Sequence, residues 1–137
     1  GSVIEITGKT MKINGAVPAG EVYVDGSGVG DVGAVVMRDR KRLAEDGMVV
    51  VVLPVSSHDG RLLSRPEIIT RGFIYVKESE DLLRELENLA MDAAEGVSGR
   101  RGRDESDLKG AVKSAVSNYL FKTTKRNPMV IPVVTKL

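Results

Sequence analysis

The stretch MVVVVLPV, residues Met48–Val55, is the longest apolar run in the chain. Its consecutive valines favour an extended strand, because branching at Cβ suits the pleated sheet better than the helix. Apolar and polar residues do not alternate along it, so we expect a strand that is buried on both faces. The run is also far too short to cross a bilayer, which takes about 20 residues. It therefore predicts the core strand of a globular domain.

Turn signals flank this strand on both sides. Glu45-Asp46-Gly47 predicts a turn into it, and Ser56–Gly60, with its final Asp-Gly pair, predicts a tight reversal after it. The chain then returns as a second strand over Arg61–Thr70. Within that strand, Pro66 should make part irregular or place it at an edge. Arg71–Val76 is one more short β-prone piece.

An amphipathic helix is expected next. Apolar residues recur at helical spacing from Leu82 to Ala93, Ser79 is a suitable N-cap, and the helix should end at Gly96.

A second helix follows a linker rich in Gly and Arg. Asp104 or Ser106 can cap it, and Leu108 begins its apolar face. Met129–Val134 is then the last strand. The order strand, strand, helix, helix, strand predicts an α/β (α+β) fold, with a three-stranded mixed sheet covered on one face by two helices.

Short strands separated by glycine are expected in residues 3–36. Val3–Thr7 and Met11–Asn14 are β-prone, and Asn14-Gly15 is a turn signal. Ala34–Met37 is another apolar stretch, whose β-branched residues do not resemble the start of a helix.

A glycine-rich tract lies within this region and contains Gly26, Gly28, Gly30 and Gly33. Its letters match GxGxxG, but a dinucleotide site needs a helix directly after the glycines, which the residues that follow do not predict. We interpret the tract as a structural loop that uses positive φ angles. A small enzyme that binds a phosphate ligand at 26–33 is the less favoured alternative.

The composition excludes several classes of site. The chain of 137 residues has no Cys and one His, so it holds neither a disulfide framework nor a centre of several histidines. His58 lies beside Asp59 in the expected turn and is interpreted as a surface residue rather than half of a catalytic pair. Acidic clusters at 78–81 and 104–107 fit helix starts better than a metal site.

The charge is balanced overall but not locally. Twenty Lys and Arg face 19 Asp and Glu, yet the segment 98–126 carries eight basic and three acidic residues, a net charge of +5. Such a segment can approach a phosphate backbone, but the residues by themselves favour a solvated basic face over a contact with nucleic acid. The candidate residues for contact with a nucleic acid are Arg71, Arg100, Arg101, Arg103, Lys122, Lys125 and Arg126.

Several strings resemble the C-terminal end of ribonuclease J, a bacterial ribonuclease of the metallo-β-lactamase/β-CASP family. They occur in order along nearly the whole chain and are VPAGEVYVDG (17–26), GVGDVG (28–33), RDRK (38–41), EDG (45–47), TRGFIYV (70–76) and TKRNPM (124–129).

The resemblance implies a division of the chain. Within residues 1–36, the last strands of the catalytic domain would follow Gly1-Ser2, a pair that is itself typical of a tag remnant. Residues 37–46 would be a linker and 47–137 a separate C-terminal domain. We therefore expect a piece of a larger cytoplasmic enzyme that cleaves RNA both internally and from the 5′ end, with zinc held upstream by motifs absent here.

By the same resemblance, this piece is expected to have no catalytic residue, metal or cofactor of its own. It would support assembly of a homo-oligomer, dimer or tetramer, and would help to position RNA, with no membrane involved. A stand-alone RNA-binding module is the alternative.

Overall fold

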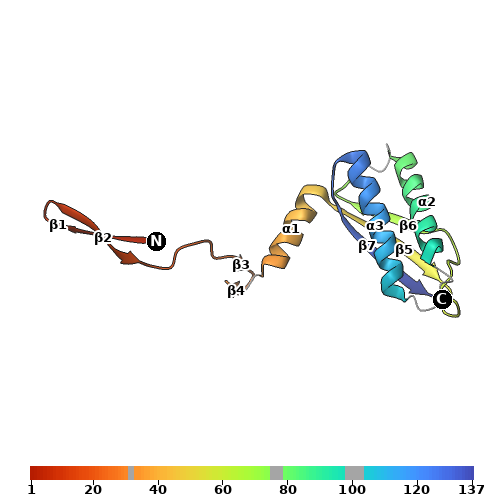
Figure 1. Cartoon of the computed structure of the whole chain (residues 1–137), viewed down its shortest axis with the longest axis horizontal. Helices are drawn as coiled ribbons and strands as arrows, with labels where there is room; N and C mark the ends of the chain where they lie inside the picture. Colours follow the sequence, from red (N-terminus) through yellow and green to blue (C-terminus); the bar gives the residue numbers. More distant parts are fainter. Residues whose placement is uncertain (31–32, 75–78, 98–103) are drawn as a thin grey trace. The chain divides into compact units, whose positions relative to one another are not determined.

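The computed structural model describes residues 1–30, 33–74, 79–97 and 104–137. The chain divides into two compact units, Gly1–Met37 and Arg38–Leu137. The second unit contains a three-stranded mixed sheet with two helices packed on one face (Figure 1). This is the predicted α+β fold.

Strand β5 (Met48–Val55) lies at the centre of this sheet. It pairs in antiparallel orientation with β6 (Glu67–Arg71) and in parallel with β7 (Met129–Lys136), so the order is β6-β5-β7. Val50 of β5 therefore lies between Ile69 and Ile131. The parallel neighbour is reached only after both helices have been traversed, as parallel pairing requires a long crossover.

The two faces of β5 differ, and the expectation of burial on both is wrong. Val49, Val51, Leu53 and Val55 are at most 3% exposed and face the helices. The alternate residues of β5 are only half-buried. An apolar residue at every position hides the alternation in the sequence, and only the placement of the helices reveals it.

The helices α2 (Glu80–Val97) and α3 (Glu105–Thr124) each present one buried stripe to the sheet. The stripes consist of Leu86, Ala90, Ala94 and Val97 in α2 and of Leu108, Val112, Val116 and Leu120 in α3. Their spacing of three or four residues follows from 3.6 residues per turn. Of the two expected caps, Asp104 rather than Ser106 caps α3, with Oδ1 accepting the N–H groups of Ser106 and Asp107 at 2.9 and 3.1 Å.

The returning strand is shorter than expected. Only Glu67–Arg71 pairs with β5 along its length, and residues before Pro66 contribute a single bridge, Val55 to Leu62. The described part of the piece after Arg71 is not a strand, because Gly72 turns the chain at φ 66°. Phe73, 2% exposed, joins the core instead.

Helix α1 (Ala34–Asp46) corrects one expectation, because Ala34–Met37 forms its first turn and not a short strand. The same helix continues through residues 37–46, the expected linker. Gly47 ends the helix at φ 74°, a conformation that glycine adopts at little cost.

The N-terminal unit consists of two small hairpins, β1 (Ser2–Thr7) with β2 (Thr10–Ala16), and β3 (Val24–Asp25) with β4 (Gly28–Val29). The first turn lies between Thr7 and Thr10, not at Asn14-Gly15, which falls inside β2 where the pairing register shifts. None of the described residues in this unit is buried. These strands therefore have no core of their own.

Replacing Gly47 by Ala should destabilise the second unit strongly. A Cβ there would lie 2.6 Å from the Gly72 carbonyl oxygen, and the positive φ adds strain. We expect a loss of about 3 kcal/mol or more in the free energy of unfolding, measured by urea titration of helical circular dichroism. The matched control is Gly60→Ala, where φ is also positive but no atom lies within 4 Å, with a loss of about 1 kcal/mol. Equal losses would show that the close approach of the two chain segments does not matter.

Candidate nucleic-acid interface

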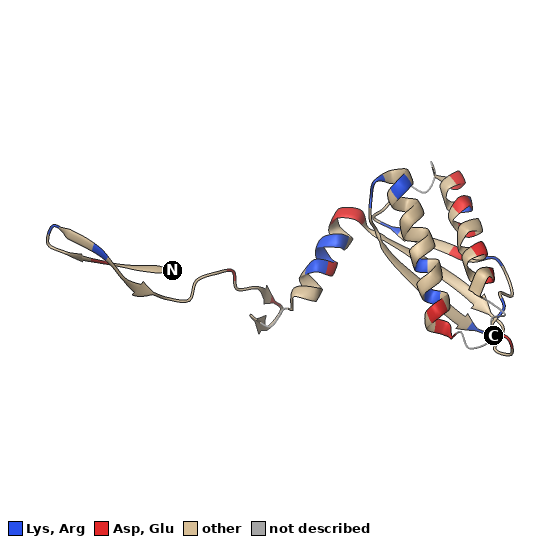
Figure 2. Cartoon of the chain, in the orientation of Figure 1, with Lys and Arg blue, Asp and Glu red and all other residues tan. Residues whose placement is uncertain are grey.

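Charge is segregated between the two helices that cover the sheet. Helix α2 carries six acidic side chains and one basic one, whereas α3 carries Lys109, Lys113 and Lys122 and is followed by Lys125 and Arg126 (Figure 2). An anionic polymer is repelled by α2 and attracted to the end of α3. The candidate surface is therefore the C-terminal end of α3.

The chain reverses sharply where α3 ends. Lys125 adopts the left-handed conformation at φ 58°, and its N–H donates to the Phe121 carbonyl oxygen at 3.0 Å. Thr124 Oγ1 donates to the Leu120 carbonyl oxygen at 2.7 Å and accepts the Arg126 N–H at 3.2 Å. This turn leaves Lys122 and Lys125 exposed and directs Arg126 back toward the fold.

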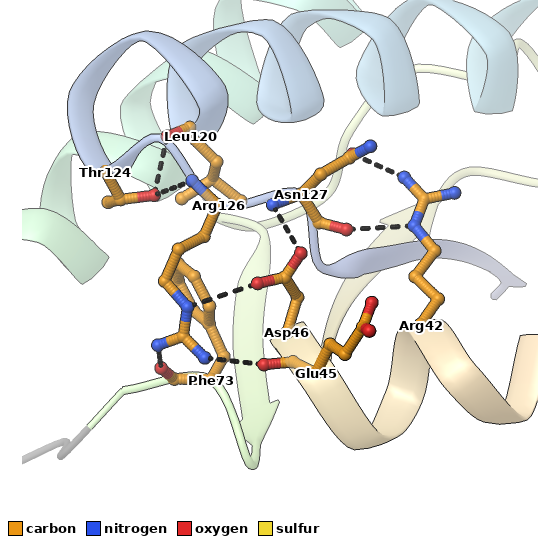
Figure 3. A network of polar contacts seen from close by, with 8 residues as sticks. All are labelled: Arg42, Glu45, Asp46, Phe73, Leu120, Thr124, Arg126 and Asn127. Atoms are coloured by element: carbon orange, nitrogen blue, oxygen red, sulfur yellow. Dashed lines mark hydrogen bonds and ion pairs between the residues drawn. The ribbon is translucent and has the colours of Figure 1, made fainter.

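The Arg126 guanidinium bridges three parts of the second unit (Figure 3). Nε donates to Asp46 Oδ1 at 3.3 Å and Nη2 to the Glu45 carbonyl oxygen at 3.2 Å, both at the end of α1. Nη1 donates to the Phe73 carbonyl oxygen, and the guanidinium carbon lies 5.2 Å from the centre of the Phe73 ring. Arg126 therefore caps α1 and stacks on a core residue at the same time.

Asn127 extends this cluster. Its N–H donates to Asp46 Oδ2 at 3.0 Å, and its carbonyl oxygen accepts from Arg42 Nε at 2.8 Å, while Arg42 Nη2 donates to Asn127 Oδ1. We call Arg42, Asp46, Phe73, Arg126 and Asn127 the α1 clasp. The clasp holds the end of α1 against the end of α3.

The structure thus separates the candidate residues. Arg126 is engaged inside the α1 clasp and has few donors left for a phosphate. Lys122, Lys125 and Arg71 are exposed, although Arg71 Nη1 also donates to the Thr70 carbonyl oxygen at 2.8 Å. Arg100, Arg101 and Arg103 lie outside the described residues.

The other end of α3 is occupied by ion pairs. Lys109 Nζ lies 2.6 Å from Glu105 Oε1, and Lys136 Nζ lies 3.1 Å from Glu105 Oε2. The hydrogen bond from Lys109, followed by that from Lys136, lowers the pKa of Glu105. Both lysines are therefore neutralised locally. Lys109 lies in the basic segment and Lys136 near the end of the chain, and both pair with Glu105 instead of facing solvent unpaired.

The residues with possible catalytic chemistry, His58 and Asp59, lie at the surface. His58 is exposed, and Asp59 faces Arg61, whose backbone N–H is the main cause that lowers the pKa of Asp59. Across the described residues, no group of three or more His, Cys, Asp or Glu side chains could hold a metal ion. These residues therefore offer no ligand set that fits zinc. In the same described part of the chain, no helix is long and apolar enough to span a membrane.

The glycine tract is built differently from a nucleotide loop. Gly26 and Gly30 have positive φ, but Gly26 lies in the tight turn of the β3–β4 hairpin, and the Gly30 N–H donates to the Tyr23 carbonyl oxygen at 2.8 Å. A helix does follow Gly33, so that argument against a dinucleotide site was wrong. The two-residue antiparallel pairing before it still differs from the parallel βαβ unit that such a site uses.

Sequence reasoning missed the α1 clasp, although its members were in view. EDG (45–47) and TKRNPM (124–129) are both strings that carry the family resemblance, and they meet in space about 80 residues apart in the chain. Arg42 lies within residues 37–46, which the resemblance assigns to a linker. No periodicity in the sequence marks such a contact.

Replacing Arg126 by Lys should lower the free energy of unfolding by about 1–3 kcal/mol. A lysine keeps the charge but lacks the planar guanidinium, whose separate nitrogens reach Asp46, Glu45 and Phe73 and whose face stacks on the Phe73 ring. Urea titration measures this loss. Lys122→Ala, which removes an exposed charge from the same helix end, should change it by less than about 0.5 kcal/mol. If Arg126→Lys were as stable as the unchanged chain, the clasp would contribute nothing.

Comparison with known proteins gives one consistent result. Residues 35–137 match the family described as the Ribonuclease J C-terminal domain. Over 137 residues, the chain is 42% identical to Ribonuclease J 2 of Staphylococcus aureus (strain NCTC 8325 / PS 47) and 40% identical to Ribonuclease J2 of Bacillus subtilis (strain 168). All of this chain is covered, but only 25% of each relative, so the chain spans a quarter of their length.

The match includes helix α1 apart from Ala34, and with it residues 37–46, the expected linker, as well as the sheet and both covering helices. The resemblance noted in the sequence is confirmed. The chain therefore belongs to the ribonuclease J family and is a ribonuclease J C-terminal region.

Proposed function

We propose that this chain is the non-catalytic C-terminal part of an RNA-degrading enzyme of the ribonuclease J type, which assembles its subunits and helps to position RNA. The relatives are ribonucleases by name and four times as long. Among the described residues of this chain, no group of three or more His, Cys, Asp or Glu side chains could hold a metal ion. RNA cleavage with zinc in a cytoplasmic parent enzyme is therefore assigned to segments beyond this chain.

The observation that carries the assembly role is the incomplete coverage of the sheet. Both helices pack on one face, while the other presents half-buried apolar residues to solvent within the described structure. That open face carries Met48, Val50, Val52, Ile69, Met129, Ile131 and Val133. Contiguous apolar surface on a soluble domain is characteristic of interfaces between chains.

The RNA role is supported by the exposed lysines at the end of α3. Lys122 and Lys125 are exposed, and neither forms an ion pair within 4 Å among the described contacts. Two such charges supply contacts to phosphate but no base readout. They therefore favour positioning of RNA over recognition of its sequence.

The N-terminal unit fits the same proposal. Its hairpins expose Ile4, Ile6, Met11 and Ile13 and have no buried residue among those described. Such strands are expected when a sheet lacks the rest of its domain. We assign them to the end of the catalytic domain.

Self-association is the first test. Analytical ultracentrifugation of the full chain should show a concentration-dependent oligomer that persists at 1 M salt, on the order of the concentration at which exposed ion pairs are screened. Apolar and backbone contacts tolerate such salt. A monomer at every protein concentration would overturn the assembly role.

RNA binding is the second test. Lys122→Glu with Lys125→Glu should weaken binding of a single-stranded RNA, measured by fluorescence anisotropy, and reduce the slope of log affinity against log salt by about 1 to 2. Lys113→Glu is the control for charge, because it lies on the same helix away from its end. Unchanged binding by the double variant would remove these lysines from the RNA surface. Cleavage of this RNA that a chelator abolishes would contradict the non-catalytic assignment.

A further inference from the structure

The two edges of the sheet differ in their capacity to accept another strand. The backbone hydrogen bonds of β5 show which N–H and C=O groups of β6 and β7 point away from the sheet. Met129 N–H donates to the Gly47 carbonyl oxygen and Leu137 N–H to that of Val55, both at 2.9 Å, so odd-numbered residues of β5 bond toward β7. Leu63 N–H donates to the Pro54 carbonyl oxygen at 2.9 Å, so even-numbered residues bond toward β6.

The β7 edge is interrupted. Because Met129 and Leu137 bond inward, the even-numbered positions of β7 direct their backbone groups outward, and Pro132 is one of them. Proline has no N–H to donate, which is how many proteins protect an edge strand from pairing. A continuous ladder cannot form on this side.

The β6 edge offers every backbone N–H and C=O group that another strand needs for pairing. Met48, Val50 and Val52 lie opposite Arg71, Ile69 and Glu67, and these pairs are the hydrogen-bonded ones because even-numbered residues of β5 face β6. Ile68 and Thr70 therefore direct their N–H and carbonyl groups away from β5. The Thr70 carbonyl oxygen accepts only from the neighbouring Arg71 side chain among the described bonds. No described strand pairs with β6 on this side.

The side chains of this edge are complementary to themselves. The strand reads Glu67-Ile68-Ile69-Thr70-Arg71, with opposite charges at its two exposed ends. A twofold axis through Ile69 places Ile69 opposite Ile69 of a second copy and Glu67 opposite Arg71 of that copy, twice. Ile68 and Thr70 then form the hydrogen-bonded pairs, which matches the direction of their backbone groups. A shift by one residue would lose both charge pairs.

We propose that β6 pairs in antiparallel orientation with β6 of a second copy, joining two sheets of three strands into one of six. This inference rests on the proposed assembly role and assigns a surface to it. On pairing, Arg71 exchanges the Thr70 carbonyl oxygen for the carboxylate of Glu67 in the second copy. Four backbone hydrogen bonds, two ion pairs and the Ile69 contact hold the seam.

Charge reversal with rescue tests the register. Glu67→Arg and Arg71→Glu each create like-charge contacts twice in the dimer and should raise its dissociation constant about tenfold or more, measured by sedimentation. The double variant restores opposite charges and should return the constant to near that of the unchanged chain. Both residues are exposed, so folding should be preserved, and Lys113→Glu controls for charge alone. Glu67→Arg also separates this role from RNA binding, because it weakens the dimer while adding positive charge.

A cysteine placed at the axis tests the geometry directly. The chain has no Cys, so Ile69→Cys introduces a single thiol, and across a pair without backbone hydrogen bonds the two Cα atoms lie about 4.5 Å apart, within disulfide reach. Mild oxidation should give a covalent dimer within minutes to hours. Val133→Cys on the same face, where the native side chain is 40% exposed, is the control and should cross-link much more slowly.

The outcomes are distinct. Rescue by the double variant together with rapid cross-linking at Ile69→Cys supports the β6 seam. An oligomer unaffected by either charge reversal, or a double variant no better than the single ones, overturns the seam and leaves the assembly role intact. A chain that stays monomeric overturns both.

Discussion

The alternation of β5 between a covered and an open face organises the whole second unit. Val49, Val51 and Leu53 are fully buried, and the apolar stripes of α2 and α3 both converge on them. Because β5 is central, its register also places β6 and β7 and determines which residues share a face. Burial of this one strand therefore decides where the core lies and which face of the sheet the helices leave uncovered.

The α1 clasp and the Gly47–Gly72 approach hold the ends of the remaining elements. Gly47 allows α1 to turn directly into β5 against the backbone of Gly72, and Arg126 then binds the carbonyl end of α1 and the Phe73 backbone. Three elements distant in sequence are joined at one end of the sheet. The charge of Arg126 stabilises this junction, which leaves Lys122 and Lys125 for contacts outside the fold.

Charge alone was a poor guide to the interface. The segment with net charge +5 read as one basic surface, but Arg126 lies in the clasp and Lys109 pairs with Glu105. The two edges of the sheet differ more clearly. In β7, Pro132 lacks the backbone N–H that pairing with another strand needs, whereas β6, from Glu67 to Arg71, contains no proline. The direction of the backbone N–H and C=O groups, together with the position of Pro132, therefore distinguishes the β6 edge from the β7 edge, which composition cannot do.

Local patterns in the sequence determined the element types: the valine run predicted β5, helical spacing predicted α2 and α3, Asp104 predicted a cap, and the order of elements predicted the α+β class. These succeed because propensity, spacing and capping act over a few residues. Tertiary structure alone decided that β5 is covered on one face, that 34–46 is a helix, and that Arg126 is a clasp residue rather than a free charge. Each of these depends on partners far away in the chain, such as Asp46 for Arg126 and the helices for β5, and no local pattern records them.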